Sequence, residues 1–205
     1  MTRPLVIEFS GLPNSGKTTL LQNLRRICEC NNISTIVMQE SAELYPKIMP
    51  KGTIEQNLWI TLETLQKCLE VSYLTGARFI FVDRGFYNQL FWATRYKEKD
   101  EEYSKYITGF MEKVAEMYRV KPDYLYIVDV DIDESIRRRM NSGEPITFSK
   151  KDFLTSYKSE FKKFAEKIDS KFYIDSTNLA EDEVAEIVFK KIVTLWWFCK
   201  NLCPC

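Results

Sequence analysis

The sequence predicts an α/β fold in which five parallel strands are covered by helices on both faces. Short apolar runs rich in β-branched residues alternate along the chain with segments whose apolar residues recur at helical spacing. Strands separated by helices run parallel, and parallel sheets are covered on both faces. No repeat, low-complexity tract or linker interrupts the 205 residues. We therefore expect a single domain over residues 1–205, long enough to bury a core.

The expected strands are short and mostly apolar. They lie at Leu5–Phe9, Ile33–Met38, Arg78–Val82, Tyr124–Asp129 and Phe172–Asp175. The expected helices carry apolar residues three and four positions apart. They cover residues 18–30, 54–73, 86–96, 101–119, 133–140, 150–168 and 181–198. Prolines and glycines predict loops over residues 39–53 and 141–148.

The charge balance argues against a polyanionic partner. Lysine plus arginine total 29 and aspartate plus glutamate total 29, so the formal net charge is zero. No global field then attracts nucleic acid or an anionic membrane. No run of about 18 apolar residues spans a membrane, and the N-terminus lacks a secretory pattern. We expect a cytoplasmic protein with reduced cysteines.

The chain contains no histidine. The commonest general base and the commonest metal ligand are therefore missing. Any proton transfer must use a carboxylate, and any hard metal must be held by oxygen ligands. These requirements favour magnesium over zinc.

The strongest motif is GLPNSGKT, from Gly11 to Thr18, which matches G-x-x-x-x-G-K-[ST] in full between an expected strand and an expected helix. Its glycines allow successive backbone N–H groups to point at phosphate oxygens, and the helix adds its positive N-terminal end. Lys17 is expected to bridge the β- and γ-phosphates of ATP, and the Thr18 hydroxyl to bind Mg²⁺. The expected nucleotide-binding residues are Gly11, Pro13, Asn14, Ser15, Gly16, Lys17, Thr18 and Thr19.

The remaining motifs resemble those of nucleoside and nucleotide kinases, meaning deoxynucleoside kinases and thymidylate kinases, from Leu5 to about Asn178. The guanine-reading N-K-x-D motif and the D-x-x-G switch of regulatory GTPases are absent, and so is the L-S-G-G-Q signature of transporters. The resemblance implies a P-loop NTPase fold with a lid segment, and ATP with Mg²⁺ as the bound nucleotide. Both families have an acidic residue followed by arginine at the end of a strand, and Asp83 and Arg84 match this pair. Deoxynucleoside kinases have a serine next, and this chain has Gly85 in its place. By resemblance, Asp83 helps to hold the metal and Arg84 contacts the acceptor or the transferred phosphate.

Glu40 follows the second expected strand. This position resembles that of a glutamate in deoxynucleoside kinases, which acts there as the base that deprotonates the sugar hydroxyl. Thymidylate kinases have Arg-Glu-Pro at this point, with the arginine on the acceptor's phosphate. Gln39 and Ser41 stand in place of that arginine and proline, which favours a neutral hydroxyl acceptor.

Three consecutive arginines, Arg137, Arg138 and Arg139, resemble the start of the lid, expected over about residues 137–149. In the family, lid arginines close over ATP and neutralise charge on the γ-phosphate. They are spaced more widely in deoxynucleoside kinases. Neighbouring helical residues point about 100° apart, so the sequence leaves open which arginine faces inward.

Two further segments complete the expected ligand contacts. Residues 175–178 follow the last strand, where these kinases let adenine rest on a loop. Aromatic and amide residues suit a flat, hydrogen-bonding acceptor, although helices packing into a core would look the same. They are Glu43, Tyr45, Gln56, Asn57, Trp59, Gln66, Phe86, Tyr87, Asn88, Gln89, Phe91, Trp92 and Arg95.

The C-terminal aromatic and cysteine-rich segment, residues 194–205, resembles no kinase element. It lacks the fourth ligand of a structural zinc site and has no C-a-a-X box. We expect an amphipathic last helix with a frayed end. An alternative is that Trp196 and Trp197 also cover a homodimer surface.

These observations lead to three hypotheses. The first is an ATP·Mg-dependent kinase acting on a nucleoside-like hydroxyl, with catalysis by Lys17, Glu40, Asp83, Arg84 and the arginines 137–139. The second keeps this machinery and uses a nucleoside monophosphate held by Arg84 and Arg95. The third is a nucleotide-binding interaction module without small-molecule kinase activity. Glu40 separates them, because a pure binding module needs no base.

Overall fold

A computed structural model describes residues 3–142 and 151–202 and contains one sheet of five parallel strands. The strands are β1 (Leu5–Gly11), β2 (Thr35–Met38), β3 (Phe79–Asp83), β4 (Tyr124–Asp129) and β5 (Lys171–Asp175). Their order across the sheet is β2-β3-β1-β4-β5, with every neighbouring pair parallel. The expected α/β fold with a five-stranded parallel sheet is therefore confirmed, and β3 lies beside β1.

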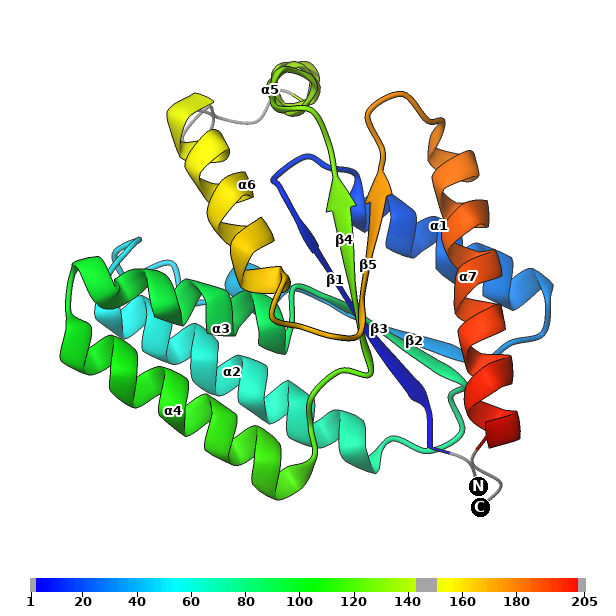
Figure 1. The fold of residues 1–205 in the computed structure, drawn as a ribbon, viewed down its shortest axis with the longest axis horizontal. Coiled ribbons are helices and arrows are strands. Elements are labelled where there is room, and N and C mark those ends of the chain that lie inside the picture. The colour runs from blue at the N-terminus through cyan, green and yellow to red at the C-terminus, as the bar shows by residue number, and fades with distance from the viewer. Residues whose placement is uncertain (1–2, 143–150, 203–205) are drawn as a thin grey trace.

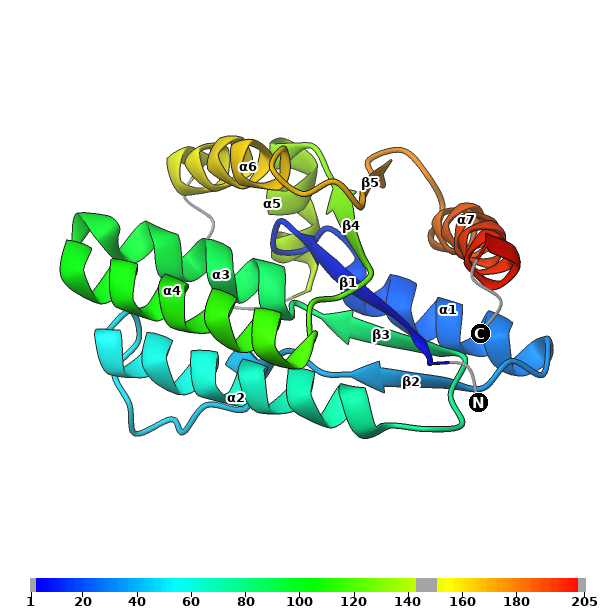
Figure 2. The same cartoon turned by 60° about the horizontal axis from the view of Figure 1, so that its bottom comes forward.

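Helices cover both faces of the sheet. They are α1 (Lys17–Cys30), α2 (Ile54–Tyr73), α3 (Phe86–Arg95), α4 (Glu101–Tyr118), α5 (Ile132–Asn141), α6 (Lys151–Ala165) and α7 (Glu181–Leu202), with short 3-10 turns at Ser41–Glu43 and Tyr96–Glu98. Helices α1 and α7 pack together on one face. Helices α2, α3 and α4 lie on the other side, α5 lies at the upper end of the sheet, and α6 packs against β4 (Figures 1 and 2).

Successive side chains of β1 point to opposite faces of the sheet and join different parts of the core. Ile7 and Phe9 are fully buried and belong to the apolar cluster that joins the sheet to α1 and α7. Val6 points to the opposite face, where it packs with β3 and α2. Glu8 and Ser10 share that second face and are also fully buried, which is unusual for a central strand.

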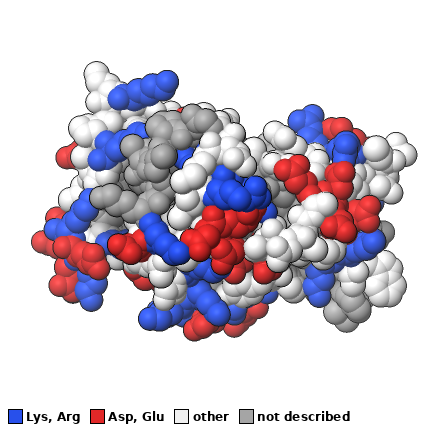
Figure 3. All heavy atoms as spheres, turned by 90° about the horizontal axis from the view of Figure 1, so that it is seen from above, with Lys and Arg blue, Asp and Glu red and all other residues white. Residues whose placement is uncertain are grey.

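The carboxyl ends of the strands meet at one edge, below α5 in Figure 1. The connection after β1 leads to one edge of the sheet, at β2, and the connection after β3 leads back to the other side of β1, at β4. Parallel sheets bind ligands at such a topological switch point. The loop after β1 and the Asp83–Arg84 pair at the end of β3 therefore lie next to each other. Seen from above in Figure 3, basic and acidic side chains are interspersed over the described part of this edge.

The observed boundaries differ from the expected ones mainly at helix ends. Helix α7 continues to Leu202, four residues beyond the expected end, so the segment expected to fray is largely helical. Part of the expected loop over residues 39–53 forms a 3-10 turn. Most of the expected lid loop lies outside the described residues. Within the part of the chain that the structure describes, no helix is long and apolar enough to cross a membrane.

Candidate functional site

The loop between β1 and α1 has the conformation that its glycines predict. Gly11 has φ of 146°, and a Cβ there would lie 2.2 Å from the carbonyl oxygen of Val128. Gly16, which precedes α1, has φ of 84°. Asn14 also has a positive φ, at 55°. Positive φ angles at several positions of one short loop are typical of an anion-binding nest, in which backbone N–H groups converge at a helix N-terminus.

Lys17 lies folded over this nest. Its side chain is buried, and Nζ donates to the carbonyl oxygen of Leu12 at 2.8 Å and to the hydroxyl of Ser15 at 3.4 Å. Burial, reinforced by the nearby Arg84 guanidinium, lowers the pKa of Lys17 to about 7. An anion bound beside this side chain would favour its charged form and raise the pKa again.

Asp83 and Thr18 form a small oxygen-rich site beside the loop. The Thr18 hydroxyl donates to Oδ2 of Asp83 at 3.3 Å. Oδ1 of Asp83 is buried and has no hydrogen-bond partner among the described residues. Burial also raises the pKa of Asp83. A carboxylate oxygen left unsatisfied beside a hydroxyl fits a hard divalent cation, whose remaining ligands would be water and phosphate oxygens.

Arg84 connects the phosphate loop to a residue from the neighbouring strand. One terminal nitrogen donates to both carboxylate oxygens of Glu40, at 3.0 and 3.2 Å, and the other donates to the carbonyl oxygen of Gly11 at 3.4 Å. Arg84 has φ of 48°, a strained backbone for a side chain of this size. Such strain persists where the surrounding structure fixes it, and here it aims the guanidinium between the loop and Glu40.

A large cleft of about 780 Å³ opens along one side of the phosphate loop. We call it the loop cleft. Asn14 to Leu20 form its floor, α5 contributes one wall, and residues 176–179 contribute another. Other lining residues are Glu134, Arg137, Arg138, Ser142, Ala180, Glu181 and Val184. The expected nucleotide-binding residues from Asn14 to Thr19 all line it.

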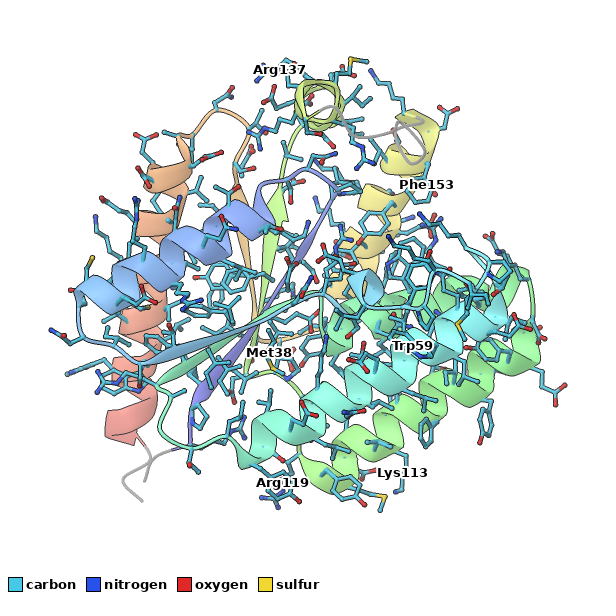
Figure 4. The ribbon with its side chains drawn as sticks, turned by 180° about the vertical axis from the view of Figure 1, so that it is seen from behind. Met38, Trp59, Lys113, Arg119, Arg137 and Phe153 are labelled. Carbon is cyan, nitrogen blue, oxygen red and sulfur yellow. The ribbon has the colours of Figure 1, made fainter. Side chains whose placement is uncertain are left out.

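A second cavity of about 350 Å³ lies on the other side of the loop. We call it the aromatic pocket. Its aromatic walls come from the loop after β2, α3, the turn after α3, and α6. Its lining residues are Pro13, Glu40, Ala42, Tyr45, Lys51, Gly52, Gln56, Asn57, Ile60, Arg84, Asn88, Gln89, Trp92, Tyr96, Arg139, Phe153 and Tyr157. Figure 4 shows Phe153 at the upper end of α6, above α2 and α3.

The three arginines of α5 separate between the two cavities. Arg138 lines the loop cleft, and its guanidinium donates to Glu134 at 2.8 Å and to the carbonyl oxygen of Ser176 at 2.7 Å. Arg137 lines the same cleft, is largely exposed and pairs with Glu134; it projects from the top of the molecule in Figure 4. Arg139 lines the aromatic pocket. Helix α5 therefore spans both cavities.

The phosphate loop and the Glu40–Arg84 pair lie where the two cavities meet. Pro13 lines the aromatic pocket, while the next residue, Asn14, lines the loop cleft. Arg84 reaches both the loop carbonyl of Gly11 and the Glu40 carboxylate of the pocket. A phosphate held by the loop would therefore face a molecule held in the aromatic pocket.

Several residues expected around an acceptor lie elsewhere. Those that do line the aromatic pocket are Tyr45, Gln56, Asn57, Asn88, Gln89 and Trp92. Phe86 and Phe91 are core residues, and Arg95 pairs with Glu160 outside the lining. Glu43, Trp59, Gln66 and Tyr87 are not among the lining residues either.

The pocket also contains residues that the sequence did not single out, chiefly Lys51, Tyr96, Phe153 and Tyr157. Tyr157 is buried and donates to Oδ1 of Asn88 at 3.2 Å. These residues come from segments far apart along the chain, and only the recurrence of aromatic residues at helical spacing on α6 offered a signal.

The first turn of the C-terminal helix lines the loop cleft through Glu181 and Val184, whereas Trp196 and Trp197 line neither cavity. The Arg78 guanidinium lies 4.4 Å from the ring centroid of Trp196, and Trp197 is 57% exposed. A homodimer through this helix stays a prediction. Cys28, Cys30 and Cys68 are free thiols, whereas Cys203 and Cys205 lie outside the described residues. Reduced cysteines stay a prediction.

Comparison with known proteins supports the fold. No family model matches the sequence, and no curated protein matches it significantly. Among solved structures, the fold is similar to that of thymidylate kinase from Candida albicans, with a TM-score of 0.65 and 16% identity over 94% of this chain and 92% of that chain. The chain thus has the α/β fold of a P-loop NTPase. This similarity is one of fold, and the function must be argued from the site.

Proposed function

We propose that this protein is an ATP·Mg-dependent phosphotransferase that transfers the γ-phosphate to a hydroxyl group of a nucleoside-like small molecule. The observation that carries the proposal is the position of Glu40. Its carboxylate lines the aromatic pocket and is held by Arg84, which also contacts the phosphate loop. A base is thereby fixed between the place for a phosphate donor and the place for an acceptor.

The loop cleft suits ATP. Inward-facing loop amides and Lys17 would bind the β- and γ-phosphates, and the wall at Ser176–Asn178 offers a resting place for the base. Arg138 would lie beside the phosphates, since its guanidinium nitrogen is 3.8 Å from the position of a Cβ on Gly16. Thr18 and Asp83 would hold magnesium, which neutralises phosphate charge when bound.

The aromatic pocket suits a flat acceptor with polar edges. Its volume of about 350 Å³ lies within the range of small-molecule sites. Trp92, Phe153 and Tyr157 offer flat apolar surface, and Asn57 and Gln89 offer amide hydrogen bonds. With no histidine in the chain, Glu40 would accept the hydroxyl proton as the acceptor oxygen attacks the γ-phosphate. Arg84 and Lys17 would stabilise the charge on the transferred group.

A monophosphate acceptor is the second candidate, because the pocket contains cations besides Arg84. Lys51 and Arg139 line it, and Lys51 forms no ion pair among the described residues. Against this candidate, Gln39 stands where thymidylate kinases place an arginine for the acceptor's phosphate. Arg95, expected to share that role, pairs with Glu160 instead.

Release of ADP from ATP·Mg across nucleosides, nucleoside monophosphates and hydroxylated antibiotics tests the proposal. Lys17→Ala serves as the blank. We expect one class of nucleoside-like hydroxyl compound to stimulate turnover in the natural protein and not in the blank. Stimulation by monophosphates alone would support the second candidate. Tight ATP binding without stimulation by any compound would instead support a nucleotide-binding module.

A further inference from the structure

A buried carboxylate outside the two cavities connects the central strand to the aromatic pocket. Glu8 lies in the middle of β1, between β3 and β4, and is fully buried. An unsatisfied charge or polar group in such a position is costly. Its hydrogen-bond partners therefore indicate what the residue is for.

Both carboxylate oxygens of Glu8 accept hydrogen bonds from the first turn of α3. Oε2 accepts from the backbone N–H of Tyr87 at 2.8 Å, and Oε1 accepts from that of Asn88 at 2.8 Å. The hydroxyl of Ser10 adds a third bond at 3.1 Å. The second and third N–H groups of a helix are the ones that an N-cap side chain normally satisfies.

The residue at the N-cap of α3 is Gly85, which offers no side-chain acceptor. A Cβ at this position would lie 3.2 Å from Oε2 of Glu8 and 2.8 Å from Cγ1 of Val82. A capping side chain at position 85 and the Glu8 carboxylate would therefore occupy the same space. The glycine at position 85 leaves room for the glutamate at position 8 to cap the helix.

The capped turn supplies the inner wall of the aromatic pocket. Asn88, whose N–H is bound by Glu8, accepts from the Tyr157 hydroxyl through its side chain. The next residue, Gln89, donates to the hydroxyl of Thr61 at 2.8 Å, and Trp92 follows one turn later. Asn88, Gln89, Trp92 and Tyr157 all line the pocket.

We propose that Glu8 is a remote N-cap of α3 and a positioning residue for acceptor binding. It touches neither cavity. It fixes the first turn of α3, so that Asn88 and Gln89 present their amides to the acceptor in one orientation. The role of Glu8 in acceptor binding rests on the proposed function, whereas its role as the N-cap of α3 does not.

Amide hydrogen exchange tests the cap without any substrate. Glu8→Ala is expected to accelerate exchange of the Tyr87 and Asn88 amides about tenfold or more. Asp100→Ala is the matched control, since the side chain of Asp100 caps α4 locally by accepting from the N–H of Tyr103, and α4 lines neither cavity. It should lower stability comparably and leave exchange in α3 unchanged. Equal exchange in α3 for Glu8→Ala and the natural protein would overturn the proposal.

A rescue experiment uses the competition between the two caps. In a Val82→Ala background, which removes the second close atom, Gly85→Ser alone should disturb α3 because its Cβ meets the Glu8 carboxylate. Combined with Glu8→Ala, the same substitution should restore slow exchange, because the serine hydroxyl then caps the helix locally. Failure of the combined variant to slow exchange relative to Glu8→Ala would contradict the remote cap.

Kinetics of an accepted substrate test the positioning role. Glu8→Ala should raise KM for the acceptor about five- to tenfold and leave KM for ATP nearly unchanged. Asp100→Ala should leave both KM values unchanged. Equal KM values for the two variants would overturn the positioning role. If no acceptor is found, the proposed function fails while the exchange experiments still decide the cap.

Discussion

The Arg84 guanidinium donates to both carboxylate oxygens of Glu40, at 3.0 and 3.2 Å, across the carboxyl ends of two neighbouring strands. Glu40 follows β2 and Arg84 follows β3, so the pair depends on the order of the strands. Both side chains are mostly shielded from solvent, with 15% and 18% exposed. The ion pair thus fixes one orientation of the Glu40 carboxylate at the wall of the aromatic pocket.

Lys17 leads to a prediction about pH. Burial first, and the Arg84 guanidinium second, lower its pKa to about 7, so it is mostly neutral above that pH. A bound triphosphate favours the charged form and must return a proton to it. ATP affinity should therefore fall as pH rises above about 7, with uptake of up to one proton. Titration calorimetry in buffers of different ionisation enthalpy measures this uptake. Lys17→Gln should remove it, and equal uptake in both proteins would contradict the assignment.

The Asp83 site predicts a magnesium effect. Asp83→Asn should raise the Mg²⁺ concentration that half-maximal ATP binding requires about tenfold or more, because a neutral amide replaces the carboxylate beside Thr18. Asp129→Asn is the matched control, since Asp129 ends β4 and pairs with Lys158. Nucleotide binding titrated with Mg²⁺ checks this. An unchanged magnesium dependence in Asp83→Asn would place the metal elsewhere.

The arginines of α5 should differ in their effects. Arg138→Ala should weaken ATP binding about tenfold, because Arg138 joins the phosphate side of the cleft to Ser176. Arg139→Ala should raise KM for the acceptor and spare ATP binding. Arg137→Ala should have the smallest effect, since that side chain is 64% exposed. Similar losses of ATP affinity in all three variants would contradict this division.

Glu8 predicts a pH dependence of stability. Burial raises its pKa from 4.5 to about 7, so the folded protein holds a proton that the unfolded chain loses between these values. The free energy of unfolding should fall by about 3 kcal/mol or less from pH 4.5 to 7 and then level off. The facing groups Cys68, Tyr87 and Tyr157 have pKa values raised to about 12 and stay neutral in this window.

Chemical denaturation of Glu8→Gln beside the natural protein checks this contribution. The variant should lack the fall, so its stability relative to the natural protein should increase between pH 4.5 and 7. A constant difference across that window would show that Glu8 keeps an ordinary pKa.

The sequence predicted the parts of the site that depend on local pattern. The phosphate loop follows from residue spacing alone, because its glycines and the following helix determine the nest. The proximity of Asp83 and Arg84 to that loop followed from their place at a strand end. The fold class was equally accessible, because alternating strands and helices leave few arrangements.

The rest depends on tertiary contacts that no local pattern contains. Tyr157 and Phe153 reach the aromatic pocket from α6, more than 100 residues after Glu40 along the chain. The directions of the three consecutive arginines depend on how α5 is rotated above the sheet. Glu8 sits in an apolar strand, and its partner Gly85 is recognisable only once β1 and α3 are placed together.

The most direct test of the central claim is transfer of labelled γ-phosphate from ATP, with the bond in the product identified by ³¹P NMR. Glu43→Gln is the matched control, because Glu43 is an exposed glutamate of the same loop. The natural protein and this control should form a phosphate monoester on an acceptor hydroxyl. Glu40→Gln should bind ATP normally and form that product about 10² to 10⁴ times more slowly. Equal rates in the two variants, or label found only in a phosphoanhydride, would contradict the account.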